Sequence, residues 1–97
     1  MAVYSLSSKA AADVDSIYEY TILNFGVEKA RSYVSGLEKG FQTLANNPLL
    51  GRSAGNLEAE LRRFEIQSHI VFYTATETGV FIVRVLHESM DVEQHVH

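Results

Sequence analysis

Residues 61–91 read LRRFEIQSHIVFYTATETGVFIVRVLHESMD, and this stretch decides the fold class. Two runs within it, 69–73 (HIVFY) and 82–87 (IVRVLH), are dense in the β-branched and aromatic residues that are typical of strands. Residues 74–79 supply turn chemistry between them, which predicts a hairpin. With a tight turn at Gln67 and Ser68, the pattern predicts three consecutive antiparallel strands over residues 61–66, 69–75 and 79–86.

The residues before this stretch predict a short strand over 3–6 and then two helices. Ser7 is a suitable N-cap for a first helix that ends at Gly26, where a residue without a side chain is favoured. The second helix runs over about 27–46, and Pro48 ends it. Gly36 and Gly40 inside this helix predict a close approach to a neighbouring element. The expected buried positions are Ala10, Val14, Ile17, Tyr18, Thr21, Phe25, Ala30, Tyr33, Val34, Leu37, Phe41 and Leu44.

Together these elements predict one α+β domain over residues 1–97, in the order β-α-α-β-β-β. A helical hairpin packs on one face of a small antiparallel sheet, because the amphipathic helices have no other apolar surface to cover. The strand at 79–86 is apolar on both faces except for Arg84, so we expect it to be central. The N-terminal strand is expected to add to an edge.

Composition excludes several classes of function. The chain has no cysteine, which excludes disulfides and thiolate metal sites, and its net charge of −4 argues against general binding to nucleic acid. We find no secretion signal and no apolar run of membrane-spanning length, so we expect a cytoplasmic protein without a membrane partner. No cofactor or metal motif is present, and the His95/His97 pair lacks further ligands at a metal-binding spacing.

Several of these features together resemble a known family. They are Leu6-Ser7 leading to Ala10 and Asp13, Pro48 with Gly51-Arg52, the strand 68–73 (SHIVFY) and the end 84–91 (RVLHESMD). Over essentially the whole chain, this pattern resembles the ParE branch of the RelE/ParE toxin superfamily.

The resemblance implies the toxin of a bacterial type II toxin–antitoxin system, of the kind that stabilises plasmids. Toxins of the ParE branch inhibit DNA gyrase and so block replication. The partner implied is a ParD-like antitoxin, a ribbon-helix-helix protein whose tail wraps the toxin, so that DNA is contacted only through the antitoxin. The RelE branch instead cleaves messenger RNA on the ribosome, and that activity is the alternative. An inactive toxin that only binds antitoxin is a third possibility.

The chemistry of the residues favours the non-enzymatic branch. Cleavage of RNA requires groups that activate a 2′-hydroxyl and stabilise a phosphorane. In RelE-type nucleases an arginine commonly follows the histidine of the SHIVFY-like strand, and here Ile70 occupies that place. Their C-terminal end offers a tyrosine, which residues 86–91 lack. The nuclease candidates that remain are Arg62, Arg63, Tyr73, Arg84 and His87.

We therefore predict two protein-binding surfaces and no catalytic or metal-binding residue. The candidates for contact with the target are Arg62, Arg63, Arg84, His87, Glu88, Ser89, Met90 and Asp91. The candidates for contact with the antitoxin are Tyr18, Ile22, Tyr33, Leu37, Phe41, Phe64 and Ile66.

Some of these polar residues also have a structural interpretation. Arg84, within an apolar strand, is expected to pair with a carboxylate or a carbonyl oxygen, because an unpaired buried guanidinium is costly. His69 is expected to be a packed or turn-capping histidine. Arg62 and Arg63 point to opposite faces of one strand, so at most one of them joins a patch with Arg84. Asp13, Asp15 and Glu19 are expected to form a solvated helix face.

Overall fold

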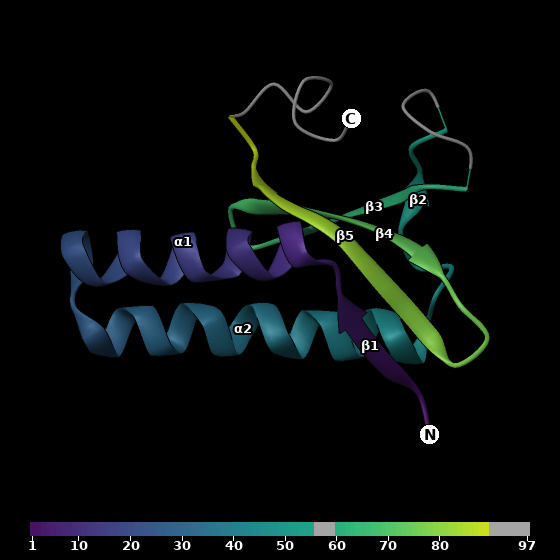
Figure 1. Cartoon of the computed structure of the whole chain (residues 1–97), viewed down its shortest axis with the longest axis horizontal. Coiled ribbons are helices and arrows are strands. Elements are labelled where there is room, and N and C mark those ends of the chain that lie inside the picture. Colours follow the sequence, from purple (N-terminus) through teal and green to yellow (C-terminus); the bar gives the residue numbers. More distant parts are fainter. Residues whose placement is uncertain (56–59, 90–97) are drawn as a thin grey trace.

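A computed structural model describes residues 1–55 and 60–89, and within them the chain forms two helices and five strands (Figure 1). The predicted order of strand, helical hairpin and three-stranded meander is confirmed, with one additional short strand before the meander. The elements are β1 (Val3–Leu6), α1 (Ser8–Phe25), α2 (Val27–Asn46), β2 (Arg52–Ser53), β3 (Arg62–Ile66), β4 (His69–Ala75) and β5 (Gly79–His87).

The strands form one sheet in the order β1-β5-β4-β3-β2. The meander β3-β4-β5 is antiparallel and β1 lies at an edge, both as predicted. Two expectations need correction. The sheet is mixed, because β1 runs parallel to β5, and no turn joins those two strands to impose an antiparallel pairing. The strand predicted to be central, β5, is an interior strand, but the middle strand of the five is β4.

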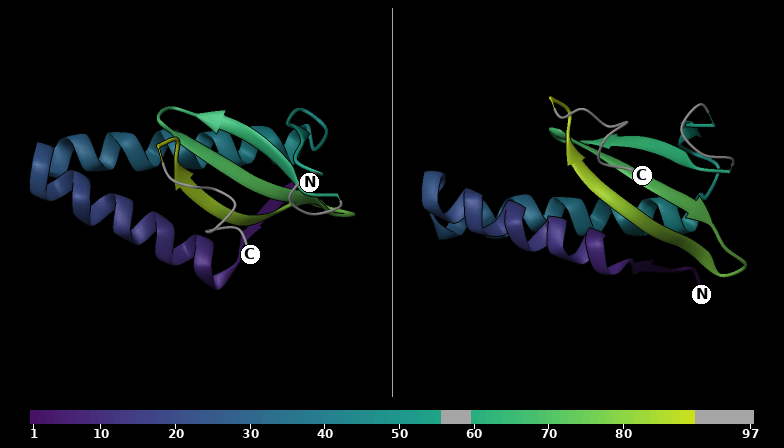
Figure 2. Two further views of the ribbon diagram at one scale, coloured as in Figure 1. Left: turned by 90° about the horizontal axis from the view of Figure 1, so that it is seen from above. Right: turned by 45° about the horizontal axis from the view of Figure 1, so that its top comes forward.

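Both helices cover one face of the sheet (Figure 2). The residues that this layer buries include Leu37, Phe41, Val71 and Tyr73, each at most 1% exposed. On the opposite face a smaller cluster gathers around Phe72, with Ala54, Leu61, Ile70 and Leu86. Alternate residues of β4 therefore serve two apolar clusters, which explains why the sequence of this strand shows no polar face.

Glycines set how tightly the helices turn and pack. Gly26 alone separates α1 from α2, with a φ of 92° that residues with side chains rarely adopt. A Cβ atom on Gly40 would lie 2.3 Å from Ile66 Cδ1, and one on Gly36 would lie 2.8 Å from Gln67 Nε2. The predicted close approach is confirmed, and it brings α2 against the end of β3 and the turn that follows.

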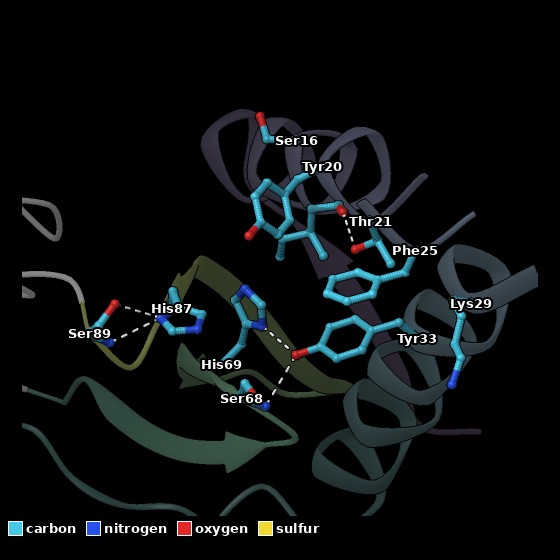
Figure 3. A pocket seen from close by; sticks show the side chains of 11 residues that line it. Ser16, Tyr20, Thr21, Phe25, Lys29, Tyr33, Ser68, His69, His87 and Ser89 are labelled. Atoms are coloured by element: carbon cyan, nitrogen blue, oxygen red, sulfur yellow. Dashed lines mark hydrogen bonds between the residues drawn. The ribbon is translucent and has the colours of Figure 1, made fainter. Parts of the chain in front are cut away.

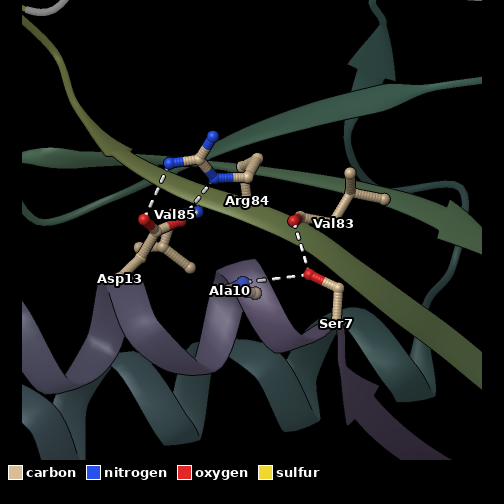
Figure 4. A network of polar contacts seen from close by, with 6 residues as sticks. All are labelled: Ser7, Ala10, Asp13, Val83, Arg84 and Val85. Atoms are coloured by element: carbon tan, nitrogen blue, oxygen red, sulfur yellow. Dashed lines mark hydrogen bonds and ion pairs between the residues drawn. The ribbon is translucent and has the colours of Figure 1, made fainter. Parts of the chain in front are cut away.

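The outer edge of β5 is completed by two different elements. From Gly79 to Ile82 it pairs with β1, which ends at Leu6. Beyond that point the start of α1 takes over: the Ser7 N–H donates to the Ile82 carbonyl at 2.9 Å, and the Ser7 hydroxyl donates to the Val83 carbonyl at 2.7 Å (Figure 4). The same hydroxyl oxygen accepts the Ala10 N–H at 2.9 Å, which confirms Ser7 as the N-cap.

Asp13, six residues after Ser7, continues this edge. Its carboxylate accepts the Val85 N–H at 2.9 Å and two hydrogen bonds from the Arg84 guanidinium, at 2.8 and 2.9 Å (Figure 4). The hydrogen bonds that Arg84 donates to Asp13 raise the pKa of Arg84. The predicted pairing of Arg84 with a carboxylate is confirmed. The expectation that Asp13 is solvated is wrong, because both side chains are only 15% exposed.

A bulge in β5 brings Arg84 to this position. Phe72 pairs with Arg84 and Tyr73 with Ile82, so Val83 has no counterpart on β4. As a result Ile82 and Val85, three residues apart, both pack in the helix-side cluster. Bulges commonly re-aim a side chain in this way.

We expect Asp13→Ala to lower the free energy of unfolding by about 2–4 kcal/mol, because it leaves a half-buried guanidinium and a strand N–H without their acceptor. Denaturant unfolding monitored by circular dichroism measures the change. Asp15→Ala, two residues along the same helix and exposed, is the matched control and should stay within about 0.5 kcal/mol of the parent. Equal effects of the two substitutions would show that the Asp13 contacts contribute nothing.

Candidate functional site

The helical hairpin is longer than the sheet it covers. In Figures 1 and 2 the end of α1 and the start of α2 extend past the last strand. Large apolar side chains at this tip are left exposed, with Tyr20 at 63%, Leu23 at 85%, Phe25 at 64% and Val27 at 45%. The expectation that Phe25 is buried is therefore wrong, because no strand reaches far enough to cover it. An exposed apolar cluster of this kind marks a surface that binds other molecules.

A pocket of about 660 Å³ lies where the exposed tip meets the ends of β4 and β5. One wall comes from the helices and the other from the strand ends. Figure 3 shows the rings of Tyr20, Phe25 and Tyr33 on the helical side, with His69 and His87 on the strand side. The lining residues are Ser16, Ile17, Tyr20, Thr21 and Phe25 of α1, Lys29 and Tyr33 of α2, and Ser68, His69, His87 and Ser89 at the strand ends.

A chain of hydrogen bonds organises the strand side of the pocket. The Ser68 N–H donates to the Tyr33 hydroxyl at 3.1 Å, and this hydroxyl is hydrogen-bonded to His69 Nδ1 at 2.6 Å. The Ser89 N–H donates to His87 Nδ1 at 3.1 Å, and the Ser89 hydroxyl lies 2.7 Å from the same nitrogen. His69 and His87 face each other across the β4–β5 pair, with ring centroids 5.3 Å apart and an interplanar angle of 89°.

The two imidazoles make this end of the pocket unfavourable for positive charge. Burial and, to a smaller extent, the nearby His87 lower the pKa of His69 from 6.5 to about 4, and Asp13 opposes the shift. His69 is therefore neutral at physiological pH. The expectation of a packed histidine is confirmed, since its ring also lies edge-on to Tyr33 at 5.5 Å between centroids.

The predicted antitoxin-binding residues divide into core and surface. Leu37, Phe41 and Ile66 are 0%, 1% and 9% exposed and belong to the core beneath the sheet, so they offer no surface to a partner. That part of the prediction is wrong, because the sheet itself covers the apolar stripe of α2. Tyr33 lines the pocket. The half-buried members outside the pocket lining are Tyr18, Ile22 and Phe64.

The predicted target-binding residues are not one patch. Arg62 Nη1 donates to the Gly51 carbonyl at 2.6 Å and holds the loop before β2, whereas the Arg63 guanidinium lies 5.6 Å from the centre of the Phe72 ring. Arg84 is bound to Asp13. His87 and Ser89 line the pocket, and Glu88 between them is exposed. Met90 and Asp91 lie outside the described residues, as do His95 and His97.

The residues considered for RNA cleavage are also dispersed. Tyr73 is fully buried on the helix side of the sheet, where its hydroxyl donates to the Pro48 carbonyl and accepts the Gly51 N–H. Burial raises the pKa of Tyr73. Its role is to anchor the loop after α2, and it does not come together with His87 or Arg84 in one site.

Sequence reasoning missed most of the pocket. Tyr20 lies outside the apolar stripe predicted for α1, and Phe25 is one of the residues that this stripe is predicted to bury. Neither residue therefore suggests a binding surface from the sequence. The available signal was the concentration of large apolar residues on both sides of Gly26, where the helices turn. His69 was recognised as packed, but its pairing with His87 depends on the register of two strands.

Two further properties bear on the site. Within residues 1–55 and 60–89, no three His, Asp or Glu side chains come close enough together to hold a metal ion. Neither of the described helices has an apolar stretch that could cross a bilayer.

Comparison with known proteins identifies relatives over nearly the whole length. Residues 4–92 match the model of a family described as the ParE toxin of the type II toxin–antitoxin system parDE. The chain is 40% identical over 96 residues to Toxin ParE1 of Caulobacter vibrioides, with 99% of each chain covered. It is 34% identical over 94 residues to Toxin ParE1 of Mycobacterium tuberculosis, with 96% of each covered.

A solved structure described as the chromosomal ParDE TA system from P. aeruginosa has the same fold. It superimposes with a TM-score of 0.76 at 21% identity, covering 90% of this chain and 96% of that one.

We expect His69 to titrate with a midpoint near pH 4 in histidine-detected NMR. His87→Gln should raise that midpoint, because it removes a neighbouring positive charge, while burial keeps it below 6.5. Since the unfolded chain takes up this proton at a higher pH than the folded chain, the stability that His69 contributes is complete above about pH 6.5 and is lost toward pH 4. A midpoint at 6.5 in the parent, or one unchanged by His87→Gln, would contradict the described packing.

Proposed function

The chain belongs to the ParE toxin family and is the toxin of a type II toxin–antitoxin system, and from that premise we propose that it inhibits DNA gyrase and is neutralised by a ParD-like antitoxin. The observation that carries this proposal is the family match over residues 4–92, supported by relatives of the same length. Gyrase is the target that the resemblance to the ParE branch implies.

The geometry favours action by binding over action by catalysis. The groups that RNA cleavage would use are held apart, with Tyr73 buried against a loop and Arg84 neutralised by Asp13. The pocket contains two imidazoles, but both use Nδ1 in structural hydrogen bonds. Lys29 is the cationic side chain that lines it, which is a weak complement to a phosphate backbone.

The pocket and the exposed tip beside it provide a docking surface for the antitoxin. An amphipathic helix that lays apolar side chains into a groove is a common mode of recognition for tails that fold on binding. The apolar and aromatic lining suits such anchors, and Lys29 at the rim suits an acidic residue beside them. The occupant we propose is therefore an antitoxin helix with large apolar side chains on one face and a carboxylate near them.

The same pocket joins residues predicted for two different partners. Tyr33 was assigned to the antitoxin, and His87 and Ser89 to the target. Because one pocket cannot hold two occupants, we propose that the antitoxin neutralises the toxin by covering a surface that the target also needs.

Purified toxin should reduce DNA supercoiling by gyrase and increase the amount of cleaved gyrase–DNA complex, and the antitoxin encoded in the adjoining reading frame should reverse both effects. A gel assay with purified gyrase measures them. Tyr20→Ser with Phe25→Ser should weaken antitoxin binding about 100-fold or more in calorimetry, because two exposed apolar anchors of the pocket are removed. Leu49→Ser is the matched control, since Leu49 is 70% exposed and lies beyond the far end of α2.

Other outcomes identify the alternatives. Unchanged gyrase activity together with cleaved transcripts on translating ribosomes would replace gyrase by the ribosome as the target. Expression without antitoxin that leaves growth unaffected would indicate a chain that only binds antitoxin. Equal loss of antitoxin binding in the Leu49 variant and in the double variant would place the docking surface elsewhere.

A further inference from the structure

The strand wall of the pocket is built around two histidines that are both hydrogen-bonded at Nδ1. The Ser89 N–H can only donate, so His87 Nδ1 is an acceptor and carries no proton. The Tyr33 hydroxyl accepts the Ser68 N–H and is hydrogen-bonded to His69 Nδ1. The neutral His87 ring therefore carries its hydrogen on Nε2.

This arrangement determines what a second proton would do. A neutral imidazole with its hydrogen on Nε2 has only Nδ1 left to protonate. At His87 the new N–H would point at the Ser89 N–H, so that hydrogen bond would be lost. The turn at Glu88 and Ser89, which forms the end of the strand wall, would lose its contact with the His87 ring and keep the hydrogen bond from the Glu88 N–H to the Ser68 carbonyl. Tyr33 can adapt more easily, because its hydroxyl oxygen can accept a second hydrogen bond.

Positive charges around the two rings oppose protonation, whereas the carboxylates of Asp13 and of Glu88, next to His87 in the chain, favour it. His69 and His87 lie 5.3 Å apart, so a charge on either ring disfavours a charge on the other. Lys29 adds a further positive charge to the pocket lining, and the tyrosines there are neutral. The Asp13 carboxylate favours a charged His69, but it is bound to Arg84. The titratable groups of the surrounding elements are Asp13 and Tyr20 of α1, Lys29 and Tyr33 of α2, His69 of β4, and Glu88, which follows His87.

We propose that this pocket binds its antitoxin helix only with His69 and His87 neutral, so that antitoxin binding is coupled to proton release and weakens on acidification. This inference rests on the proposed antitoxin function of the pocket. An apolar anchor that fills the pocket removes water from His87, which is exposed in the free toxin, and desolvation disfavours a charged imidazole. The coupling depends on His87, because Ser89 holds its Nδ1 as an acceptor and its ring is exposed in the free toxin.

The test is calorimetric titration of the full toxin with the antitoxin encoded in the adjoining reading frame, between pH 7.5 and pH 5.5. We expect Kd to rise by up to about tenfold over this range, because exclusion of one proton costs up to tenfold in affinity per pH unit below the pKa of an imidazole. His87→Gln should bind at pH 7.5 and should vary less than about threefold, since glutamine can still accept the Ser89 N–H but does not titrate.

Controls separate this inference from the function on which it rests. Glu77→Gln, at the opposite end of the β4–β5 pair, should retain the pH response of the parent and so exclude a general effect of surface charge. Circular dichroism at both pH values shows that each protein stays folded. Binding at pH 7.5 with a flat profile, a Kd that falls on acidification, or an unchanged response in His87→Gln would each overturn the coupling. Absence of binding at pH 7.5 would instead overturn the antitoxin assignment, and the coupling with it.

Discussion

The structure depends on how the outer edge of β5 is completed after β1 ends. A four-residue strand cannot pair with the whole of a nine-residue strand, and unpaired backbone groups at a covered edge are costly. Ser7, the N-cap of α1, and Asp13, in the second turn of α1, solve this problem with one backbone N–H and two side chains. Their acceptors and donors reach Ile82, Val83 and Val85, so the helix substitutes for the missing length of strand.

The pairing of α1 with the edge of β5 fixes the orientation of the helical layer. A helix bound to the strand edge at two points one to two turns apart has little freedom to rotate, so its apolar residues are held over the sheet. Gly26 then returns the chain as α2, and Gly40 admits the Ile66 side chain. The hairpin consequently extends past the sheet at the end away from β1, and this leaves Tyr20 and Phe25 exposed beside the histidine pair. The pocket is thus a consequence of the same geometry.

Local pattern in the sequence predicted the elements well, because periodicity, caps and turn residues act over a few positions. Ser7, Gly26 and Pro48 marked the helix boundaries, and the bounds of β4 agree with the prediction. Pairing between distant segments was not predictable. The parallel sense of β1, the two-residue β2 and the contact of Asp13 with Arg84 each join positions far apart in the chain, and no short motif encodes them.

The candidate site was predicted only in part, for the same reason. Tyr33, His87 and Ser89 were selected from the sequence, but for two different partners, and their common pocket follows from packing. Leu37 and Phe41 were misassigned because an apolar stripe looks the same whether a sheet or a partner covers it. Asp13 shows the opposite error: it is expected on a solvated helix face, whereas it is the carboxylate partner that the sequence predicts for Arg84.

Hydrogen exchange of the Val85 amide tests the central claim most directly, because this N–H is bound by an α1 side chain and not by a neighbouring strand. If α1 completes the sheet, the Val85 amide exchanges only on global unfolding, with the same protection as the slowest amides of β4. Exchange of Val85 at a rate close to that of an unprotected amide, while β4 stays protected, would mean that α1 detaches from an intact sheet and would contradict the account.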